Sequence, residues 1–299
     1  MDIDSSPAIG AILRDARNAE LSNFRLIRAQ RGVRVYRCGL NGGSAIAKYF
    51  ECCEDRREIG NYRMLAALGV PTLRAHALGE TSILLEDIAA STDWRLGAEG
   101  DLADPHVGGA IADWYFCLHE AGAAAPGLGA LYCETDAITD AALAALCEKL
   151  PEAAGTLRRI AERIGRLRAL LDALPATLTY NDFYWTNLAV RNDRRQALMF
   201  DYNLLGRGYR YADIRNVLSA LQGGAAEAFS DRYALLYRRM HGADWAAEER
   251  GQQRIDRVAS PLCTLIAAFD RPQFPDWAQA ERAAAVDGSL RRAAAALLA

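Results

Sequence analysis

The chain has 299 residues, 51% of them hydrophobic, which is enough to bury the core of one large domain or two moderate ones. Its 35 basic and 38 acidic residues give a net charge of −3 without a long run of either sign, so the charge pattern expected of a nucleic-acid or anionic-membrane partner is missing. No apolar stretch approaches the ~20 residues of a membrane-spanning helix, and the acidic start Met1-Asp2-Ile3-Asp4 differs from a basic secretion signal, so we expect a cytoplasmic protein.

The seven cysteines include no C-x-x-C pair, so neither a zinc site nor a disulfide framework is expected. The adjacent Cys52 and Cys53 could form a redox pair. Free thiols in a reducing compartment are the favoured interpretation.

The first ninety residues have the pattern of a small antiparallel sheet with one helix. The expected strands cover residues 24–27, 33–36, 45–50, 73–78 and 82–86, and the expected helix covers 54–68. Gly69, with Pro71 shortly beyond it, is a normal signal for the end of a helix.

Beyond Ala90 the sequence becomes rich in Ala and Leu at helical spacing. Helices are expected at residues 107–119, 137–150 and 157–174 and from 214 onward, with 283–299 as a terminal helix, while 178–201 has strand-like runs. The pattern predicts an α+β fold with two lobes, a β-rich lobe at 1–88 and a helical lobe at 89–299.

Asp182 and Asn187 stand five positions apart in Tyr180-Asn181-Asp182-Phe183-Tyr184-Trp185-Thr186-Asn187, the spacing found in kinase catalytic loops. A hairpin is predicted from Leu188 onward, and it ends at Asp201. Such a hairpin would bring Asn187 beside Asp201, where their oxygens could share a magnesium ion bound to ATP phosphates. Each residue alone could instead be a turn residue, a cap or a surface carboxylate.

Lys48 ends an alternating strand, so Ile46 and Lys48 should face one side, toward a cleft, while Ala45, Ala47 and Tyr49 face the other. A lysine there can neutralise nucleotide phosphates if a carboxylate holds it in place. Glu58 on the following helix is the preferred candidate for that carboxylate, and Glu54, one turn earlier, is the alternative. Standing alone, Lys48 could equally be an exposed edge-strand lysine.

A different phosphate-binding loop is suggested by residues 42–49, which nearly match G-x-x-x-x-G-K-[ST]. It is disfavoured because Ala47 replaces the second glycine, and Tyr49 is too bulky for the small hydroxyl residue beside magnesium. The turn around Gly32 is the best candidate for a loop that covers the phosphates, although it holds one glycine instead of three.

The order of these motifs resembles the aminoglycoside phosphotransferase and choline kinase type of small-molecule kinase, which has a protein-kinase-like fold. The family's loop commonly reads His-Gly-Asp-x-x-x-x-Asn, and this chain has Tyr180 and Asn181 in place of His and Gly. The resemblance implies that Asp201 binds metal and that Asp213 braces the catalytic loop.

The same resemblance implies that residues 83–88 form the linker between lobes, where backbone groups of Glu86, Asp87 and Ile88 would bind the adenine edge. A buried strand that ends in a turn is the alternative. His119 resembles the family's Leu-His at a helix end, and a structural role is favoured for it.

The resulting hypothesis is an ATP- and Mg²⁺-dependent transfer of the γ-phosphoryl group to a hydroxyl of a small molecule, which would be aminoglycoside-, choline- or sugar-like. Asp182 would orient the hydroxyl and accept its proton, Asn187 and Asp201 would hold magnesium, and Lys48 would bind phosphates. A protein substrate is disfavoured because no A-P-E follows Asp201.

The acceptor site is left open by the sequence. Residues 269–277 mix acids with aromatics, as a site for a cationic amine would, but an ordinary surface loop is favoured. The aromatic run from Phe183 to Trp185 could form an apolar wall for the acceptor or merely pack the loop. The alternative function is a catalytically weak or inactive pseudokinase that acts as a nucleotide-binding or scaffold protein, which the Tyr180-Asn181 replacement and the sparse glycines motivate.

Overall fold

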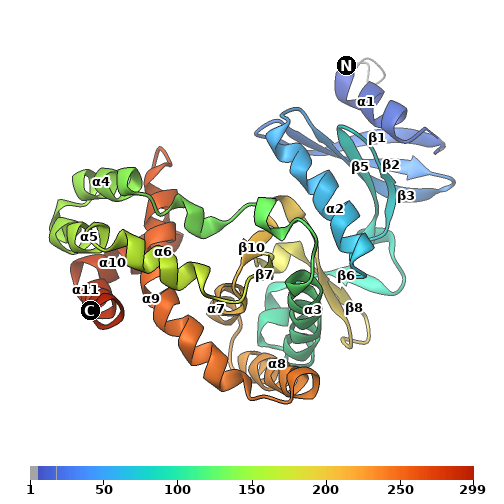
Figure 1. Ribbon diagram of the computed structural model, residues 1–299. Coiled ribbons are helices and arrows are strands. Elements are labelled where there is room, and N and C mark those ends of the chain that lie inside the picture. The colour runs from blue at the N-terminus through green and yellow to red at the C-terminus, as the bar shows by residue number, and fades with distance from the viewer. Residues whose placement is uncertain (1–5, 18) are drawn as a thin grey trace. The chain divides into compact units, whose positions relative to one another are not determined.

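The computed structural model describes residues 6–17 and 19–299 (Figure 1). The acidic start at residues 1–4, one basis for expecting a cytoplasmic protein, lies outside this range. Within the described chain, no helix combines the length and apolarity that crossing a membrane requires.

The helices and strands follow one another in an order that is mostly β at first and mostly α later. The helices are α1 (Pro7–Asp15), α2 (Arg57–Ala67), α3 (Pro105–Ala123), α4 (Asp140–Lys149), α5 (Ala154–Ala161), α6 (Ile164–Asp172), α7 (Arg210–Ala220), α8 (Gly224–His241), α9 (Trp245–Phe269), α10 (Gln279–Val286) and α11 (Ser289–Leu298). The strands are β1 (Leu21–Gln30), β2 (Val33–Leu40), β3 (Gly43–Phe50), β4 (Ala75–Leu78), β5 (Ser82–Glu86), β6 (Trp94–Leu96), β7 (Thr177–Thr179), β8 (Leu188–Arg191), β9 (Ala197–Met199) and β10 (Gly206–Gly208).

The chain divides into two compact units. The first contains the described residues up to 121 together with Tyr180–Leu205 and Asn216–Leu236, and the second contains Gly122–Thr179, Gly206–Arg215 and Tyr237–Ala299. The predicted boundary at residue 88 separates a nucleotide-binding lobe from a lobe that carries the catalytic loop and the acceptor site. It is a division by function, whereas the two units are defined by compactness, so the boundary stays a prediction.

The first unit is built around an antiparallel sheet in the order β1-β2-β3-β5-β4. All five strands were predicted; β1, β2 and β3 are longer than expected, β5 has its expected range and β4 is shorter. Helix α1 covers one face of this sheet, where its Ile9 and Ile12 pack in one buried cluster with Ala45 and Ala47. Removing this apolar surface from water favours the layered arrangement of helix on sheet. The opposite face carries Lys48 beside apolar residues, among them Ile46 and the buried Ile83 and Leu85.

Helix α2 ends where the sequence predicts. Gly69 has a left-handed φ of +72°, and its N–H bonds the carbonyl of Ala66, while the N–H of Val70 bonds the carbonyl of Leu65 at 3.0 Å. This pair of bonds is the Schellman motif, which needs glycine at this position because a Cβ disfavours positive φ.

The second unit is mainly helical, and its core joins α4, α5, α6, α9 and α11 through buried side chains such as Leu157, Leu262 and Leu265. The single helix expected at 157–174 is wrong, because α5 and α6 are separated at Arg163, where φ is −122° and ψ is 18°. The apolar stripe at Leu157, Ile160, Ile164 and Leu167 runs through the break without a change of spacing, so periodicity could not reveal it.

The expected single terminal helix is also two helices, α10 and α11. Gly288 separates them with a left-handed φ of +87°. Three short elements, α1, β6 and β10, were not predicted. β6 pairs with β8, and β10 pairs with β7, so short non-local pairing rather than a long pattern defines these two strands.

Candidate active site

Lys48 projects from the face of the sheet that α1 does not cover. Ala45 and Ala47 are fully buried in the cluster with α1, and the alternation along β3 places Ile46 and Lys48 on the other side. The predicted facing of this strand is therefore confirmed.

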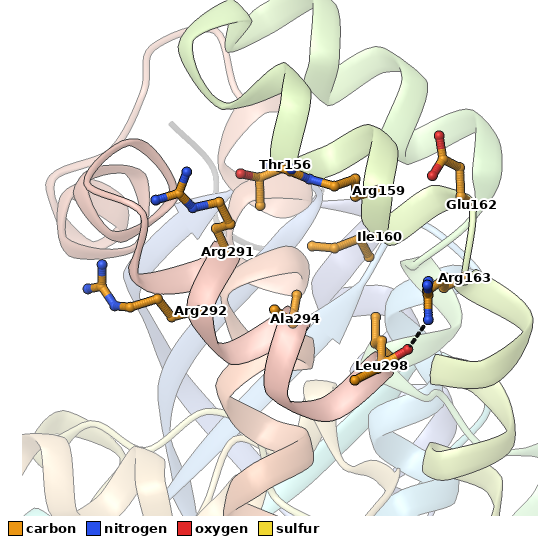
Figure 2. Close-up of a pocket in the computed structure, with 11 residues that line it drawn as sticks. Thr156, Arg159, Ile160, Glu162, Arg163, Arg291, Arg292, Ala294 and Leu298 are labelled. Atoms are coloured by element: carbon orange, nitrogen blue, oxygen red, sulfur yellow. Dashed lines mark hydrogen bonds between the residues drawn. The ribbon is translucent and has the colours of Figure 1, made fainter.

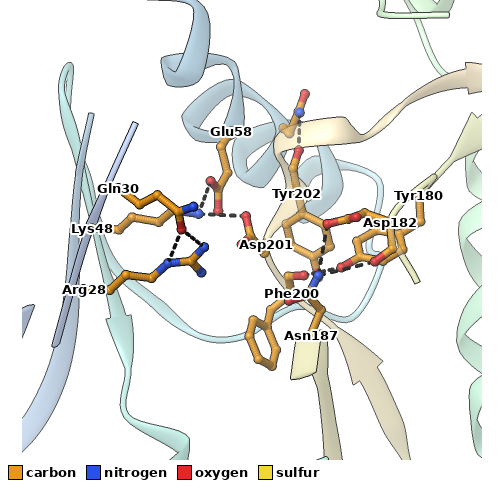
Figure 3. A network of polar contacts seen from close by, with 11 residues as sticks. Arg28, Gln30, Lys48, Glu58, Tyr180, Asp182, Asn187, Phe200, Asp201 and Tyr202 are labelled. Atoms are coloured by element: carbon orange, nitrogen blue, oxygen red, sulfur yellow. Dashed lines mark hydrogen bonds and ion pairs between the residues drawn. The ribbon is translucent and has the colours of Figure 1, made fainter. Parts of the chain in front are cut away.

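Lys48 connects two carboxylates. Its Nζ lies 2.5 Å from Glu58 Oε2 on α2 and 2.8 Å from Asp201 Oδ1 (Figure 3). Glu58 was the preferred partner of Lys48, and this ion pair is present, whereas Glu54 lies in an exposed turn that precedes α2.

For Lys48 and for Glu58, burial and the charge of the other member of the pair shift the pKa in opposite directions. Burial disfavours the charge on Lys48, but attraction to Glu58 and Asp201 outweighs it, so the pKa of Lys48 is raised. Burial raises the pKa of Glu58 to about 7, although the attraction of Lys48 acts against that shift. The arrangement keeps a cation positioned among oxygen atoms.

Tyr180 fills the position of the family's histidine as a fully buried side chain. Its hydroxyl donates a hydrogen bond to the carbonyl oxygen of Phe200, and its ring contacts Trp114, Tyr115 and Tyr202 edge to face. A packed ring with a bonded hydroxyl is what a buried tyrosine requires.

Asn181 fills the position of the family's glycine. Its φ of +65° lies in the left-handed region, which glycine and asparagine adopt most readily, and its Nδ2 donates to the carbonyl of Leu204 at 3.0 Å. The backbone conformation that a glycine would supply is therefore retained.

Asp182 and Asn187 are bonded to each other. Asn187 Nδ2 donates to Asp182 Oδ2 at 3.1 Å and to the carbonyl of Asp182 at 3.3 Å. Burial and the nearby charge of Asp201 raise the pKa of Asp182, while the bond from Asn187 and the charge of Lys48 act against that shift. The Asn187 amide bonds Asp182 through its nitrogen and retains its carbonyl oxygen as a possible ligand.

The β8–β9 hairpin carries Asn187 and Asp201 at its two ends, as predicted. Leu188 pairs with Met199, and the N–H of Phe200 bonds the carbonyl of Asn187 at 3.0 Å. Asp201 has φ 64° and ψ 68°, a left-handed conformation that costs energy outside glycine and is common at functional sites.

The proposed linker follows β5. Asp87 is buried, and its carboxylate accepts hydrogen bonds from Arg37 Nε at 2.6 Å and Ser44 Oγ at 2.7 Å, which tie this segment to β2 and β3. Glu86 accepts the N–H of Arg74 at 2.7 Å, and Ile88 begins a short 3₁₀ turn. The side chain of Asp87 thus has a bracing role, and adenine binding by the backbone stays a prediction.

The chain matches the model of the phosphotransferase enzyme family over residues 23–250, which is about three quarters of its length. The chain belongs to this family. The phosphotransferase class expected from Asp182, Asn187 and the strand lysine is thereby confirmed at the family level.

Solved structures similar to this phosphotransferase have kinase folds. A putative fructosamine-3-kinase from Thermobifida fusca aligns with a TM-score of 0.61 at 16% identity and covers 97% of this chain and 99% of its own. A macrolide 2'-phosphotransferase from Brachybacterium faecium gives 0.58 at 16%, covering 93% and 98%. An aminoglycoside phosphotransferase mutant with bound ADP and hygromycin B gives 0.53 at 15%, covering 95% and 98%.

These likenesses confirm the predicted protein-kinase-like α+β fold of the phosphotransferase. Curated proteins gave no significant match.

Other predicted residues of the phosphotransferase lie as follows. His119 is fully buried with its Nδ1 2.7 Å from Tyr233 Oη, as a structural role would require. Asp213 is fully buried in α7 of the second unit, and its bracing role stays a prediction. Phe183 is buried against Tyr115, whereas Tyr184 and Trp185 are 55% and 37% exposed.

The loop at 269–277 of the phosphotransferase already pairs its aromatic rings with arginines. The guanidinium of Arg271 lies 5.2 Å from the ring centre of Trp277, and that of Arg282 lies 5.3 Å from Phe274. These contacts agree with the favoured interpretation of an ordinary surface loop.

A cavity of about 490 Å³ lies in the second unit of the phosphotransferase, between α5 and α11 (Figure 2). Four arginines contribute to its wall, namely Arg159, Arg163, Arg291 and Arg292. Arg163 donates to the carbonyl of Leu298. None of the residues predicted for catalysis lines this cavity.

Sequence patterns missed the supports of the site. Arg37 and Ser44 hold Asp87, and Asn61 on α2 donates to the carbonyl of Tyr202 at 2.7 Å, one residue after Asp201. These partners are far apart in the chain, so no local spacing signals them. Only the strand alternation, which places Arg37 opposite Ile46 and so on the same face as Lys48, could have identified one of them.

Proposed function

We propose that this phosphotransferase uses ATP and Mg²⁺ to phosphorylate a hydroxyl group of a small molecule. The observation that carries the proposal is the convergence of Asp182 and Asn187 with the ion-paired Lys48, Glu58 and Asp201 within one unit. The similar aminoglycoside phosphotransferase with bound ADP supports a nucleotide donor.

Each side chain has a separate task in the proposed transfer. Lys48 binds the nucleotide phosphates, and Glu58 holds Lys48 in position. Asp182 orients the acceptor hydroxyl and takes its proton, a role that its raised pKa and partial exposure favour. Positioning and charge stabilisation then supply most of the rate increase.

Asn187 and Asp201 suit a magnesium ion. The set offers one amide carbonyl oxygen and one partly exposed carboxylate, and Mg²⁺ in kinases is held by a few such hard oxygens together with phosphate. When bound, the ion would neutralise charge on the phosphates. Asn187 also fixes the orientation of Asp182 through its amide nitrogen.

The adenosine part of the nucleotide is assigned to the sheet and the linker. The backbone of Glu86, Asp87 and Ile88 would bind the adenine edge, Ile46 would supply an apolar contact, and Gly32 would stand in the turn above the phosphates. The bracing of Asp87 by Arg37 and Ser44 supports this assignment because it fixes the backbone of the linker.

The acceptor is proposed to be aminoglycoside-, choline- or sugar-like. Tyr184 and Trp185 follow Asp182 closely and are exposed, so their rings can pack against a sugar face or a cationic amine. Phe183 is excluded from this wall because it is buried in the loop's packing.

The test is ATP-dependent phosphorylation across a panel of hydroxylated metabolites and antibiotics. With the substrate that the panel identifies, Asp182→Asn should lower kcat by about 100-fold or more. Asp193→Asn, an exposed aspartate in the β8–β9 turn, is the matched control and should retain activity. Full activity of Asp182→Asn would refute the role of that carboxylate. Magnesium-dependent ATP binding without transfer to any compound would favour the scaffold alternative.

A further inference from the structure

Arg28 on β1 lies in the same cross-strand row as Lys48. Arg28 is opposite Val35 on β2, and Val35 is opposite Lys48 on β3. Directly opposed residues of antiparallel strands project from the same face, so Arg28 and Lys48 share the face that α1 does not cover. Figure 3 shows both side chains extending from the sheet in one direction, with Gln30 beside them.

The distance between the two cations suits a single extended anion. Two strand spacings separate the Cα atoms of Arg28 and Lys48, which is about 10 Å. Between them stands Val35, a short, partly exposed side chain that extends less far from the sheet than either cation can. A polyphosphate could therefore contact both cations.

The guanidinium of Arg28 is oriented by Gln30, a neutral side chain that does not offset its positive charge. Gln30 Oε1 accepts hydrogen bonds from Arg28 Nε, at 3.1 Å, and from Nη2, which uses two of the five N–H groups. Across residues 6–17 and 19–299, no acidic side chain forms an ion pair with Arg28. Three N–H donors thus remain for a ligand.

Lys48 needs assistance with a polyanion because it already faces the carboxyl groups of Glu58 and Asp201. The β1–β2 turn offers little help. It has only two residues, Arg31 and Gly32, with φ of 49° and 78°, which is the tightest kind of hairpin turn. The carbonyl of Gly32 also accepts the N–H of Glu51 at 2.9 Å, which ties the turn to the end of β3. Such a turn is too short to surround a phosphate with successive backbone N–H groups.

We propose that Arg28 binds the terminal phosphates of the nucleotide and takes over the work of a glycine-rich loop, with Gln30 as its positioning residue. The proposal rests on the nucleotide-dependent function proposed above. A guanidinium suits this task because its planar fork can bind two phosphate oxygens at once.

Calorimetric titration with MgATP, MgADP and AMP tests the proposal without knowledge of the acceptor. Arg28→Ala should weaken MgATP binding about tenfold and leave AMP binding unchanged within about twofold. Arg28→Lys should recover part of the loss, and Gln30→Ala should show a smaller loss with the same dependence on phosphate number.

Arg34→Ala is the matched control, because Arg34 lies opposite Tyr49 and so projects from the other face of the same hairpin. It should bind all three nucleotides like the wild type. If Arg28→Ala lost ATP and AMP binding equally, or lost neither, the role proposed for Arg28 would be overturned, but the proposed function would stand. A wild-type protein that binds none of the nucleotides would overturn both this role and the proposed function.

Discussion

The hydroxyl of Tyr180 donates a hydrogen bond to the carbonyl oxygen of Phe200, the residue immediately before Asp201. Tyr180 itself stands two positions before Asp182 in the chain. One buried contact therefore connects the segment that carries the proposed base with the hairpin end that carries the proposed metal ligand. A tyrosine in place of the usual histidine preserves this part of the site instead of weakening it.

Replacing Tyr180 with Phe should destabilise the protein by about 1–3 kcal/mol, because the fully buried Tyr180 loses its hydroxyl and the partly buried carbonyl of Phe200 loses this donor, while the ring packing is kept. Urea unfolding of the two proteins measures the difference. Tyr184→Phe removes a hydroxyl from an exposed ring in the same loop and should change stability by less than about 0.5 kcal/mol. Equal midpoints for Tyr180→Phe and wild type would show that the hydrogen bond contributes nothing.

Substitutions at Asn181 should rank by backbone strain. Asn181→Gly keeps the left-handed conformation and loses side-chain interactions such as the bond to Leu204, at a cost of about 1 kcal/mol. Asn181→Val also loses that bond and forces a β-branched residue to φ +65°, which adds about 1–2 kcal/mol.

Asn192 provides a matched control for Asn181. Its Nδ2 likewise donates to a backbone carbonyl, that of Thr92 at 2.7 Å, but its φ is not positive. The Gly variant should therefore be more stable than the Val variant at position 181, but not at position 192. The unfolding free energies of the four variants measure this. The same ranking at both positions would argue against strain as the cause.

The sequence predicted those parts of the site that depend on local spacing. Asp182 and Asn187 lie in one short loop, Lys48 and Ile46 follow the alternation of one strand, and the hairpin to Asp201 has clear strand and turn residues. Glu58 could be preferred over Glu54 because it leads into the apolar face of α2. In each case the prediction used only residues that are close together in the sequence.

The parts that were missed depend on residues distant in the chain. The bond between Asn61 and the Tyr202 carbonyl joins residues 141 positions apart, and Arg37 and Asp87 are 50 positions apart. The break between α5 and α6 leaves the apolar spacing intact, so tertiary packing decides it. The turn around Gly32 was the best candidate for a loop that covers the phosphates, and its two-residue geometry follows from strand pairing up to Gln30 and Val33, which no local glycine pattern signals.

Glu58 should make the stability of the protein depend on pH. Its pKa is about 7 in the folded protein against an ordinary value of 4.5, so the folded state binds one more proton than the unfolded state between these values. This contribution is fully present below pH 4.5 and is lost as the pH rises through 7. Relative to wild type, Glu58→Gln should gain stability across that interval, with a slope of at most about 1.4 kcal/mol per pH unit.

Urea unfolding at half-unit steps from pH 4.5 to 8 measures this slope, provided that both proteins unfold in two states. Glu54→Gln is the control, because Glu54 is exposed and its pKa is lowered, so it should not produce a gain of this sign. Parallel stability curves for Glu58→Gln and wild type would contradict the raised pKa of Glu58.

The pair of Lys48 and Glu58 should show energetic coupling that itself depends on pH. At pH 8, Lys48→Met removes the cation whose attraction lowers the pKa of the 1%-exposed Glu58, so this carboxyl must either take up a proton or stay charged without a partner, which should cost about 3–5 kcal/mol. The double variant Lys48→Met/Glu58→Gln removes both charges and should be more stable than the sum of the single losses implies. At pH 5 Glu58 is protonated, so the cost of Lys48→Met and the coupling should both shrink. Unfolding free energies for the four proteins at the two pH values measure the cycle. A coupling that is the same at pH 5 and pH 8 would mean that Glu58 does not change its protonation between them, and no coupling at either pH would mean that Asp201, rather than Glu58, is the main partner of Lys48.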